Sequence, residues 1–457
     1  MSRCLTALRC WLLAGAVAAL AHAETAPRPN IVVIFADDLG YGDTSTYRPD
    51  GDVRTPAIDR LAADGMRFTA MRANATVCSP SRAALMTGRY ADRVGVPGLI
   101  RSNFNTWGYL DPTVPTLADL LREAGYHTAL VGKWNLGLTP GQLPNDRGFD
   151  HFHGFLDDMM DSYTTHLRRG VNFMRLNREE VRPEGHATAV FSDWAIDYFE
   201  DRAAPAHRDE PFFLYLAYTA PHYPLQPPPE ALARVQARAP EMPEQRALNV
   251  ALVEDLDTQI GRVMDTLRAT GLADNTLVFV TSDNGGALNF SQNNDPWRGG
   301  KRDHYDGGLR VPFVATWPAH VAAGTESDYV GLVFDIFVTA LEEAGAEVPA
   351  GLDAQSLGPA LRGEAPTAAE NERQLYFVRR EGERYGGKTY EALIRGDWKL
   401  MQNDPFSPLE LYNLKEDPLE QHDRMADEPE LAKELTEALA LEVQQAGAVP
   451  WQAPAKP

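Results

Sequence analysis

The stretch Pro29-Asn30-Ile31-Val32-Val33-Ile34-Phe35, followed at once by Asp37-Asp38, decides how this chain folds. A short continuous apolar run is typical of a strand that is buried on both faces of a sheet. Residues 55–65 follow it as an amphipathic helix that ends at a glycine. A buried strand followed by a helix is the repeating unit of a parallel sheet covered by helices.

The same alternation of strands and helices continues along the chain. Helical periodicity is found in residues 116–125, 189–200 and 246–270, and apolar strand-like runs in residues 126–131, 212–218 and 277–282. We therefore expect an α/β fold with a large, mainly parallel sheet sandwiched between helices. In such sheets ligands bind beyond the carboxyl ends of the strands.

The composition changes towards the C-terminus. Residues 363–372 are small and polar, which indicates a linker. Beyond it, residues 374–379 and 390–401 have the character of strands, and residues 428–443 that of a terminal helix, followed by a loose tail. We expect a main domain over residues 24–365 and a small α+β subdomain over residues 366–457.

The N-terminus and the charge restrict where the protein acts. Residues 1–23 contain two arginines, an apolar run and the triplet Ala21-His22-Ala23, which predicts a secretory signal peptide and a periplasmic or secreted protein. No later segment is long and apolar enough to span a membrane, so no membrane contact is expected after signal cleavage. The net charge of -21 argues against nucleic acid as a partner.

Cys78 is the one cysteine expected in the mature chain, because Cys4 and Cys10 lie in the predicted signal peptide. It therefore cannot form an intramolecular disulfide. Most isolated cysteines are small buried apolar residues. A lone thiol in an exported protein can instead have a chemical role. The surrounding sequence is Cys78-Ser79-Pro80-Ser81-Arg82.

Two pairs of oxygen-bearing side chains follow predicted strands. Asp37-Asp38 comes directly after the first strand, and Asp283-Asn284 directly after residues 277–282. Each pair alone could be a helix cap or a turn. Two pairs at equivalent strand ends can instead converge on one hard cation, and their oxygen atoms suit Ca²⁺, or Mg²⁺, better than zinc.

The pattern Cys-x-Pro-x-Arg at residues 78–82, with Ala83-Ala84-Leu85-Met86-Thr87-Gly88-Arg89 after it, resembles the type I sulfatases of the alkaline phosphatase superfamily. The resemblance runs from Pro29 to about Pro312 and more weakly over residues 411–418. It implies an alkaline phosphatase-like fold and the hydrolysis of sulfate esters. It also implies that a formylglycine-generating maturation enzyme oxidises Cys78 to 3-oxoalanine (formylglycine).

The resemblance also implies roles for individual residues. Metal ligands would be Asp37, Asp38, Cys78, Asp283 and Asn284. Catalytic residues around Cys78 would be Arg82, Lys133, Asn135, His222 and Lys301. Arg82 would orient the formylglycine hydrate, and the lysines and His222 would contact the sulfate and the leaving oxygen, with either His222 or Lys301 protonating that oxygen.

Two positions depart from the family pattern. Asn135 stands where the family usually has a histidine thought to help release sulfate, and Asp306 replaces a glutamate. An amide cannot accept a proton near neutral pH, so the identity of the regenerating base is open. A nearby histidine such as His153 or His304 could replace it.

The substrate is expected to be a sulfated saccharide rather than a simple aryl sulfate. Residues 151–158 and 289–295 are expected to be polar loops that set specificity. The predicted substrate-binding residues are His153, Asp157, Asp158, Arg302 and His304. Two other functions remain open: a phosphonate monoester or phosphodiester hydrolase of the same superfamily, and, because of Asn135, a catalytically weak sulfated-glycan binding protein.

Overall fold

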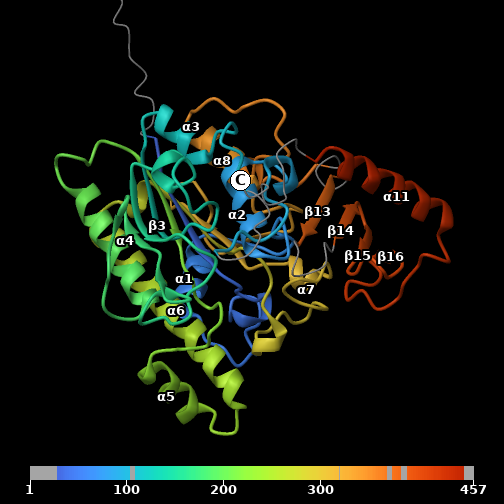
Figure 1. Cartoon of the computed structure of the whole chain (residues 1–457), viewed down its shortest axis with the longest axis horizontal. Helices are drawn as coiled ribbons and strands as arrows, with labels where there is room; N and C mark the ends of the chain where they lie inside the picture. Colours follow the sequence, from blue (N-terminus) through green and yellow to red (C-terminus); the bar gives the residue numbers. More distant parts are fainter. Residues whose placement is uncertain (1–27, 103–108, 319, 368–372, 382–388, 447–457) are drawn as a thin grey trace, which may run out of the picture.

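A ten-stranded sheet forms the centre of the molecule (Figure 1). The structure is a computed structural model that describes residues 28–102, 109–318, 320–367, 373–381 and 389–446. The strands lie in the order β12-β2-β11-β10-β1-β9-β3-β4-β7-β8. The central five are parallel to one another: β10 (Thr276–Ser282), β1 (Asn30–Ala36), β9 (Phe212–Ala217), β3 (His127–Lys133) and β4 (His151–Phe155).

Short strands extend this parallel centre on both sides. On one side, β11 (Phe313–Thr316) is antiparallel to β10, and β2 (Met66–Phe68) and β12 (Thr325–Ser327) follow it. On the other side, β7 (Met174–Leu176) and β8 (Glu179–Glu180) add an antiparallel edge to β4. A separate two-stranded hairpin is formed by β5 (Leu167–Arg168) and β6 (Val171–Asn172). The large, mainly parallel sheet expected from the sequence is confirmed.

Helices cover both faces of the sheet, and β1 shows how the sequence achieves this. Ile31, Val33 and Phe35 point to one hydrophobic core, and Val32 and Ile34 to the other, because side chains alternate along a strand. The first core is covered by α2 (Cys78–Thr87), α3 (Leu117–Glu123) and α8 (Asp335–Glu343). The second is covered by α1 (Pro56–Asp64), α4 (Ala187–Ala203), α5 (Pro229–Arg238) and α6 (Glu244–Ala269).

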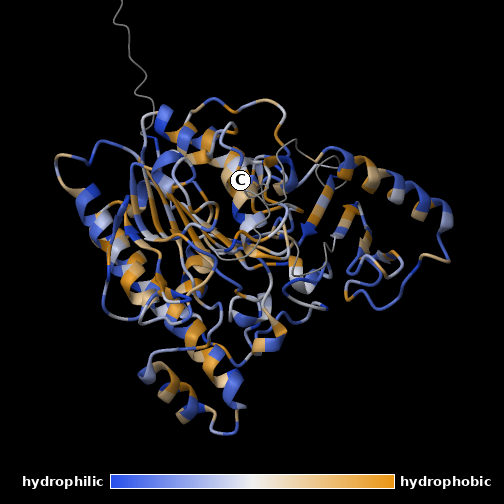
Figure 2. Ribbon diagram, viewed as in Figure 1, coloured by the Kyte–Doolittle hydropathy of each residue, from blue (hydrophilic) through white to orange (hydrophobic). Residues whose placement is uncertain are grey.

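Hydropathy follows this layering, since the strands are largely apolar while the outer helices present both apolar and polar residues (Figure 2). The short helices α7 (Asp306–Leu309) and α9 (Gly358–Leu361) lie in connections. Within the residues that the structure describes, no helix is both long and apolar enough to cross a bilayer. The predicted signal peptide, residues 1–23, and the tail from residue 447 lie outside the described residues.

A second, four-stranded antiparallel sheet follows near the C-terminus. It consists of β13 (Gln374–Arg380), β14 (Thr389–Arg395), β15 (Trp398–Gln402) and β16 (Glu410–Asn413), with α11 (Pro429–Gln444) packed on β14 and β15. The sequence predicted one strand over residues 390–401, which was wrong. Gly396 adopts a positive φ of 55° and turns the chain there, so this segment forms a hairpin. The domain boundary near residue 365 stays a prediction.

The prediction that residues 151–158 form a polar loop was also partly wrong. Residues 151–155 are β4, an inner strand of the large sheet. Phe152 and Phe155 are fully buried on it, and His153 stacks on Trp194 of α4, with ring centroids 3.3 Å apart. The two histidines made this segment look like a polar loop, but they are partly buried by aromatic stacking on α4.

A buried ion cluster joins the second sheet to the main sheet. Asp306 accepts hydrogen bonds from Arg72, at 2.7 and 3.1 Å, and from Lys399 of β15, at 3.0 Å. Lys399 also pairs with Glu420 at 2.7 Å. All four residues are at most 2% exposed, so the charges stabilise one another away from water. The position where the family pattern has glutamate is thus part of the contact between the sheets.

We predict that Gly132→Ala destabilises the fold strongly, by about 3 kcal/mol or more. Gly132 has a φ of 104°, and a Cβ atom there would lie 2.0 Å from the Ala217 carbonyl oxygen in the neighbouring strand. Gly141→Ala is the matched control, because its φ is also positive, at 86°, but its Cβ would meet nothing within 4 Å. The control should cost about 1 kcal/mol.

Urea denaturation of both variants measures this difference. Equal losses of unfolding free energy in Gly132→Ala and Gly141→Ala would show that the close approach of β3 and β9 is not what requires glycine at position 132.

Candidate active site

Two strand ends deliver four oxygen-bearing side chains to one place. Ala36 of β1 pairs with Ser282 of β10, so the residues after them, Asp37-Asp38 and Asp283-Asn284, start from adjacent positions. All four side chains are fully buried. The Asp38 amide donates to Asp283 Oδ1 at 3.1 Å, and Asn284 Nδ2 donates to Asp38 Oδ1 at 2.7 Å. The two predicted pairs therefore do converge.

Helix α2 brings Cys78 and Arg82 to the same place. Cys78 is the first residue of this helix and Arg82 lies one turn later, so both side chains face the strand ends. The Cys78 thiol donates to Asp37 Oδ1 at 3.2 Å, and Arg82 Nη2 lies 2.8 Å from Asp283 Oδ2. The thiol thus sits at the amino end of a helix, where the helix dipole favours negative charge.

Two lysines complete the cluster. Lys133, the last residue of β3, places Nζ 2.7 Å from Asp37 Oδ2. Lys301 places Nζ 2.6 Å from Asp38 Oδ1 and 3.5 Å from Cys78 Sγ. Each of Asp37, Asp38 and Asp283 therefore has its own cationic partner, with Arg82 on Asp283. This set of residues is called the charge cluster below.

Burial and charge act against each other on these groups. Burial disfavours the carboxylate of Asp37, but Lys133 and its other neighbours outweigh burial and lower its pKa to about 2. Burial and the nearby Asp37 raise the pKa of Asp283. Burial, together with Asp283 and Asp37, raises the pKa of the Cys78 thiol well above its ordinary value. An unmodified Cys78 is therefore a neutral thiol here and a poor nucleophile.

His222 faces the charge cluster from a loop after β9. Its Nδ1 lies 2.6 Å from the Tyr223 carbonyl oxygen, and its Nε2 lies 3.6 Å from Asp38 Oδ2. A backbone carbonyl can only accept, so Nδ1 carries a proton and Nε2 is directed into the site. Burial and the positive charge of Lys301 lower the pKa of His222.

The chemistry of these donors fits a divalent cation. Ligand atoms of Asp37, Asp38, Cys78 and His222 lie within 4.8 Å of one another. In addition, the buried Asn284 Oδ1 receives no hydrogen bond within the described part of the chain. An unsatisfied buried amide oxygen beside carboxylates is what a hard, oxygen-preferring cation requires. The sequence had not placed His222 among the possible metal ligands.

Asn135 is not among the residues that line the pocket at Cys78. It is fully buried, accepts a hydrogen bond from the Ser79 hydroxyl at 2.8 Å and donates to the Ile100 carbonyl at 2.9 Å. Its φ of 58° is in the left-handed region, which asparagine tolerates better than most residues. The structure thus places Asn135 as a brace between α2 and the segment at Ile100.

The two histidines considered as replacements for the family histidine lie elsewhere. His153 stacks on Trp194, and burial lowers its pKa to about 4. His304 is fully buried, and burial together with Lys399 lowers its pKa well below the ordinary value. Neither lines the pocket at Cys78. Their positions follow from packing of β4 on α4 and of the second sheet on the main domain, which local sequence does not reveal.

Of the remaining predicted substrate-binding residues, one is structural and two line the cavity at Cys78. Asp157 is fully buried and accepts hydrogen bonds from the amide and hydroxyl groups of Ser102, so it holds a loop. Asp158 and Arg302 line a cavity of about 70 Å³ above Cys78. The other lining residues are Leu99, Arg101, Arg168, Arg169, His222, Tyr223 and Lys301. Arg101, Arg168 and Arg169 were missed, although a basic Arg168-Arg169-Gly170 turn in an acidic chain was a visible signal.

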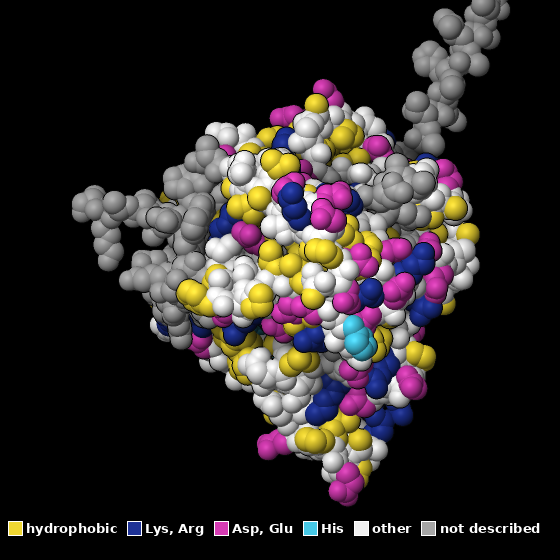
Figure 3. Space-filling view, turned by 90° about the vertical axis from the view of Figure 1, so that its right-hand side faces the viewer, with side chains coloured by type: hydrophobic (Ala, Val, Ile, Leu, Met, Phe, Trp, Pro, Cys, Tyr) yellow, Lys and Arg dark blue, Asp and Glu magenta, His cyan; other side chains and the backbone are white. Residues whose placement is uncertain are grey.

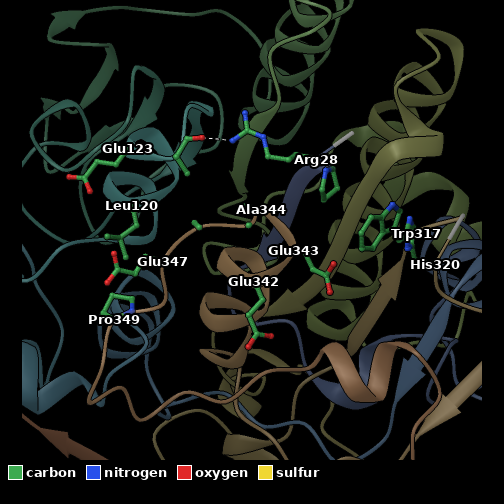
Figure 4. A pocket seen from close by; sticks show the side chains of 14 residues that line it. Arg28, Leu120, Glu123, Trp317, His320, Glu342, Glu343, Ala344, Glu347 and Pro349 are labelled. Carbon is green, nitrogen blue, oxygen red and sulfur yellow. Dashed lines mark hydrogen bonds between the residues drawn. The ribbon is translucent and has the colours of Figure 1, made fainter. Parts of the chain in front are cut away.

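A much larger cavity, of about 1120 Å³, lies elsewhere (Figure 4). Arg28, just before β1, lines it together with Trp317 and several glutamates from α3, α8 and the segment after α8. It therefore lies by the amino ends of the parallel strands, opposite the charge cluster. None of the predicted site residues lines it.

The fold, a mainly parallel sheet between helices, is that of the hydrolases of the alkaline phosphatase superfamily. The sulfatase family profile matches residues 29–346, and that of the N-sulphoglucosamine sulphohydrolase C-terminal region matches residues 298–447. The chain belongs to the sulfatase family, whose members are sulfuric ester hydrolases.

Similar individual proteins support the assignment to this family. N-acetylgalactosamine-6-sulfatase of Sus scrofa is 34% identical over 81% of this chain and 71% of its own length. The N-acetylgalactosamine-6-O-sulfatase of Bacteroides thetaiotaomicron is 29% identical over 92% of this chain and 94% of its own. The crystal structure of Ps i-CgsB in complex with k-i-k-neocarrahexaose has a TM-score of 0.84 at 30% identity, covering 94% of this chain and 95% of that one.

A phosphonate monoester hydrolase of Agrobacterium radiobacter has a TM-score of 0.66 at 22% identity, covering 92% of this chain and 96% of that one. At this identity the likeness shows the shared fold alone.

We predict that Arg82→Ala costs about 3–5 kcal/mol of unfolding free energy, because it leaves Asp283 as a buried carboxylate without its cation. Arg262→Ala is the control. Arg262 pairs with Asp193 at 2.7 Å, but both side chains are about half exposed. Its loss should cost under about 1 kcal/mol. Urea denaturation of the two variants tests this, and a similar small loss in both would contradict the role assigned to Arg82.

Proposed function

We propose that this protein hydrolyses a sulfate ester on a sulfated carbohydrate, using formylglycine made from Cys78 and a bound calcium ion. The observation that carries the proposal is the position of Cys78. Its Sγ lies 3.2 Å from Asp37 and 3.5 Å from Lys301, at the start of a helix and inside the charge cluster. An inert core cysteine would have apolar neighbours instead.

Formylglycine and calcium would supply the nucleophile, since the hydrated aldehyde offers an acidified oxygen to the sulfur atom when the cation is bound. The residues that would hold the cation are Asp37, Asp38, Asp283 and Asn284, with residue 78. Magnesium has the same oxygen preference and is the alternative ion. Maturation requires a formylglycine-generating enzyme as a partner.

The lysines have a second task in this proposal. In the structure Lys133 and Lys301 neutralise Asp37 and Asp38. With a cation held by these carboxylates, both ammonium groups would be able to turn to the sulfate oxygens and offset their charge. Arg82 stays on Asp283 and fixes the carboxylate.

Proton transfer to the leaving oxygen falls to Lys301 or His222. Both line the pocket, whereas Asn135 braces the backbone of Ile100. Lys301 Nζ lies 3.5 Å from Cys78 Sγ, the position of the nucleophile. Asn135 cannot act as the base that the family histidine provides. Lys301 and His222 would therefore also serve the release of sulfate that regenerates formylglycine.

The carbohydrate substrate is supported by the relatives. Proteins named for N-acetylgalactosamine-6-sulfate hydrolysis and a structure bound to a neocarrahexaose share at least about 29% of the sequence over most of this chain. Together with the predicted signal peptide, this favours an exported enzyme, periplasmic or secreted, that acts on sulfated polysaccharide.

We expect Cys78→Ser to bind sulfated saccharide but to lose multiple turnover by at least about 1000-fold, because a serine ester of sulfate cannot collapse to an aldehyde. The measurement is sulfate release from a matured preparation, with Ser407→Ala, an exposed serine between β15 and β16 that does not line the pocket, as the control. Full turnover by Cys78→Ser would exclude formylglycine as the nucleophile.

Aryl phosphonate and phosphodiester substrates, assayed beside the sulfate ester, test the alternative hydrolase activity. Glycan binding with no release of sulfate by the matured wild type would instead support a binding protein.

We predict that Asp283→Asn loses most of its bound calcium together with its activity, because one anionic ligand is removed while Arg82 keeps its positive charge in the site. Metal content by elemental analysis after gel filtration measures this. Asp193→Asn, which changes an exposed carboxylate, should keep both calcium and activity. An unchanged metal content in Asp283→Asn would remove this residue from the ligand set.

A further inference from the structure

The cavity at Cys78 has more positive charge than one sulfate group needs. Its lining includes the cationic residues Arg101, Arg168, Arg169, Lys301 and Arg302, against the single carboxylate of Asp158. The chain as a whole is acidic, with a net charge of -21. On the face shown in Figure 3, acidic and basic side chains are mixed. The excess of arginine at the cavity is therefore a local feature.

Three of these cationic residues form ion pairs with carboxylates of the protein. Arg168 is buried and forms a two-pronged ion pair with Asp158, at 2.9 and 3.0 Å. Arg101 pairs with the buried Glu381 at 3.3 Å. Lys301 belongs to the charge cluster. These three residues build the wall of the cavity.

Arg169 and Arg302 differ from these three residues in their greater exposure to solvent, and these two are called the arginine rim. Both are exposed although they line the cavity. The guanidinium of Arg302 has no hydrogen bond or ion pair to any residue that the structure describes. An exposed arginine at the mouth of a cavity, above a site for one anion, is suited to hold another anion by paired hydrogen bonds.

The backbone of the arginine rim is held in an uncommon conformation. Arg169 has a φ of 50° and Arg302 a φ of 84°, both in the region that non-glycine residues rarely adopt. The surroundings fix both: the Arg169 amide donates to the Asp161 carboxylate, and the Arg302 amide donates to the Thr76 carbonyl oxygen at 2.9 Å. Such conformations cluster at ligand-binding sites, where the surrounding structure maintains them.

The C-terminal sheet contributes to this arrangement. Arg379 of β13 donates to the Arg302 carbonyl oxygen at 3.3 Å and pairs with Glu381 at 2.9 Å, and Glu381 in turn holds Arg101. Arg302 is thus fixed from both sides of its peptide unit.

The lining of the cavity also includes an aromatic surface. Tyr223 lines the cavity and stacks between His222 and Phe290, with ring centroids 4.3 and 4.2 Å away. Tyr223 and Phe290 are partly exposed. An aromatic face of this kind can support the apolar face of a sugar ring. The cavity, at about 70 Å³, has room for the sulfate group but leaves the sugar at its mouth, beside the arginine rim.

We propose that the arginine rim binds a second anionic group of the substrate, a sulfate or a carboxylate on the saccharide, next to the sulfate ester that is cleaved. The substrate class is then a saccharide with at least two neighbouring anionic groups. This inference rests on the proposed function, because it takes Cys78 as the position of the cleaved ester. Arg169 and Arg302 act as specificity residues that contact the part of the substrate that does not react.

The test compares three disaccharides that share one cleavable sulfate: one with no other charge, one with a second sulfate and one with a carboxylate on the adjacent ring. Binding is measured by calorimetry in the Cys78→Ser background, where turnover is blocked, and kcat/KM in the matured wild type. We expect a preference for the dianionic ligands of about 10-fold or more at low salt, since each arginine contact to an anion is charge-assisted.

In the double variant Arg169→Gln/Arg302→Gln, this preference should fall to about threefold or less. Lysine at both positions should restore part of it, because the charge returns without the two-pronged geometry. Arg60→Gln, which changes an exposed arginine of α1, should leave the preference intact. The ratio between the second-sulfate and the carboxylate ligand identifies which anion the rim takes.

Two results would overturn the proposal: equal affinity of the wild-type rim for all three ligands, or an unchanged preference in the double variant. Failure of the proposed function gives a different result. The matured wild type would then release no sulfate from any of the three, while the binding measurements would still report on the arginine rim.

Discussion

The pairing of three buried carboxylates with three buried cations around Cys78 is the interaction on which the site depends. Asp37, Asp38 and Asp283 are fully buried, and each would be costly to ionise alone. Lys133, Lys301 and Arg82 come from β3, the loop after β10 and α2, so the charges fix those elements relative to one another. The same charged groups are those that would bind the sulfate ester and the divalent cation of the proposed reaction.

The sheet makes this arrangement possible because its central strands are parallel. Asp37, Asp283, Lys133 and His222 all follow or end strands of that centre, and their carboxyl ends lie at one edge. The second sheet also takes part in this arrangement. Lys399 donates a hydrogen bond to Asp306, Arg379 donates to the Arg302 carbonyl, and Glu381 pairs with Arg101. The C-terminal region therefore supports loops that line the cavity at Cys78.

Sequence reasoning found the strand-end residues because strand, loop and motif lie close together in the chain. Cys78 and Arg82 were found for the same reason, one helical turn apart. Sequence reasoning failed where packing between distant segments determines a residue's position. His153 stacks on α4 and His304 is buried near Lys399, whereas the segment that forms β4 had the composition of a loop. The arginine rim was only half predicted, because Arg169 reaches the cavity from a hairpin whose position depends on the buried pair of Arg168 and Asp158.

The account stands on the conversion of Cys78, and peptide mass spectrometry tests that most directly. The protein would be expressed together with a formylglycine-forming maturation system, and the peptide from Ala73 to Arg82 analysed. We predict a mass lower by ~18 Da at residue 78, the change expected when a thiol becomes an aldehyde. An unmodified cysteine, in a preparation where a known sulfatase is matured in parallel, would contradict the account.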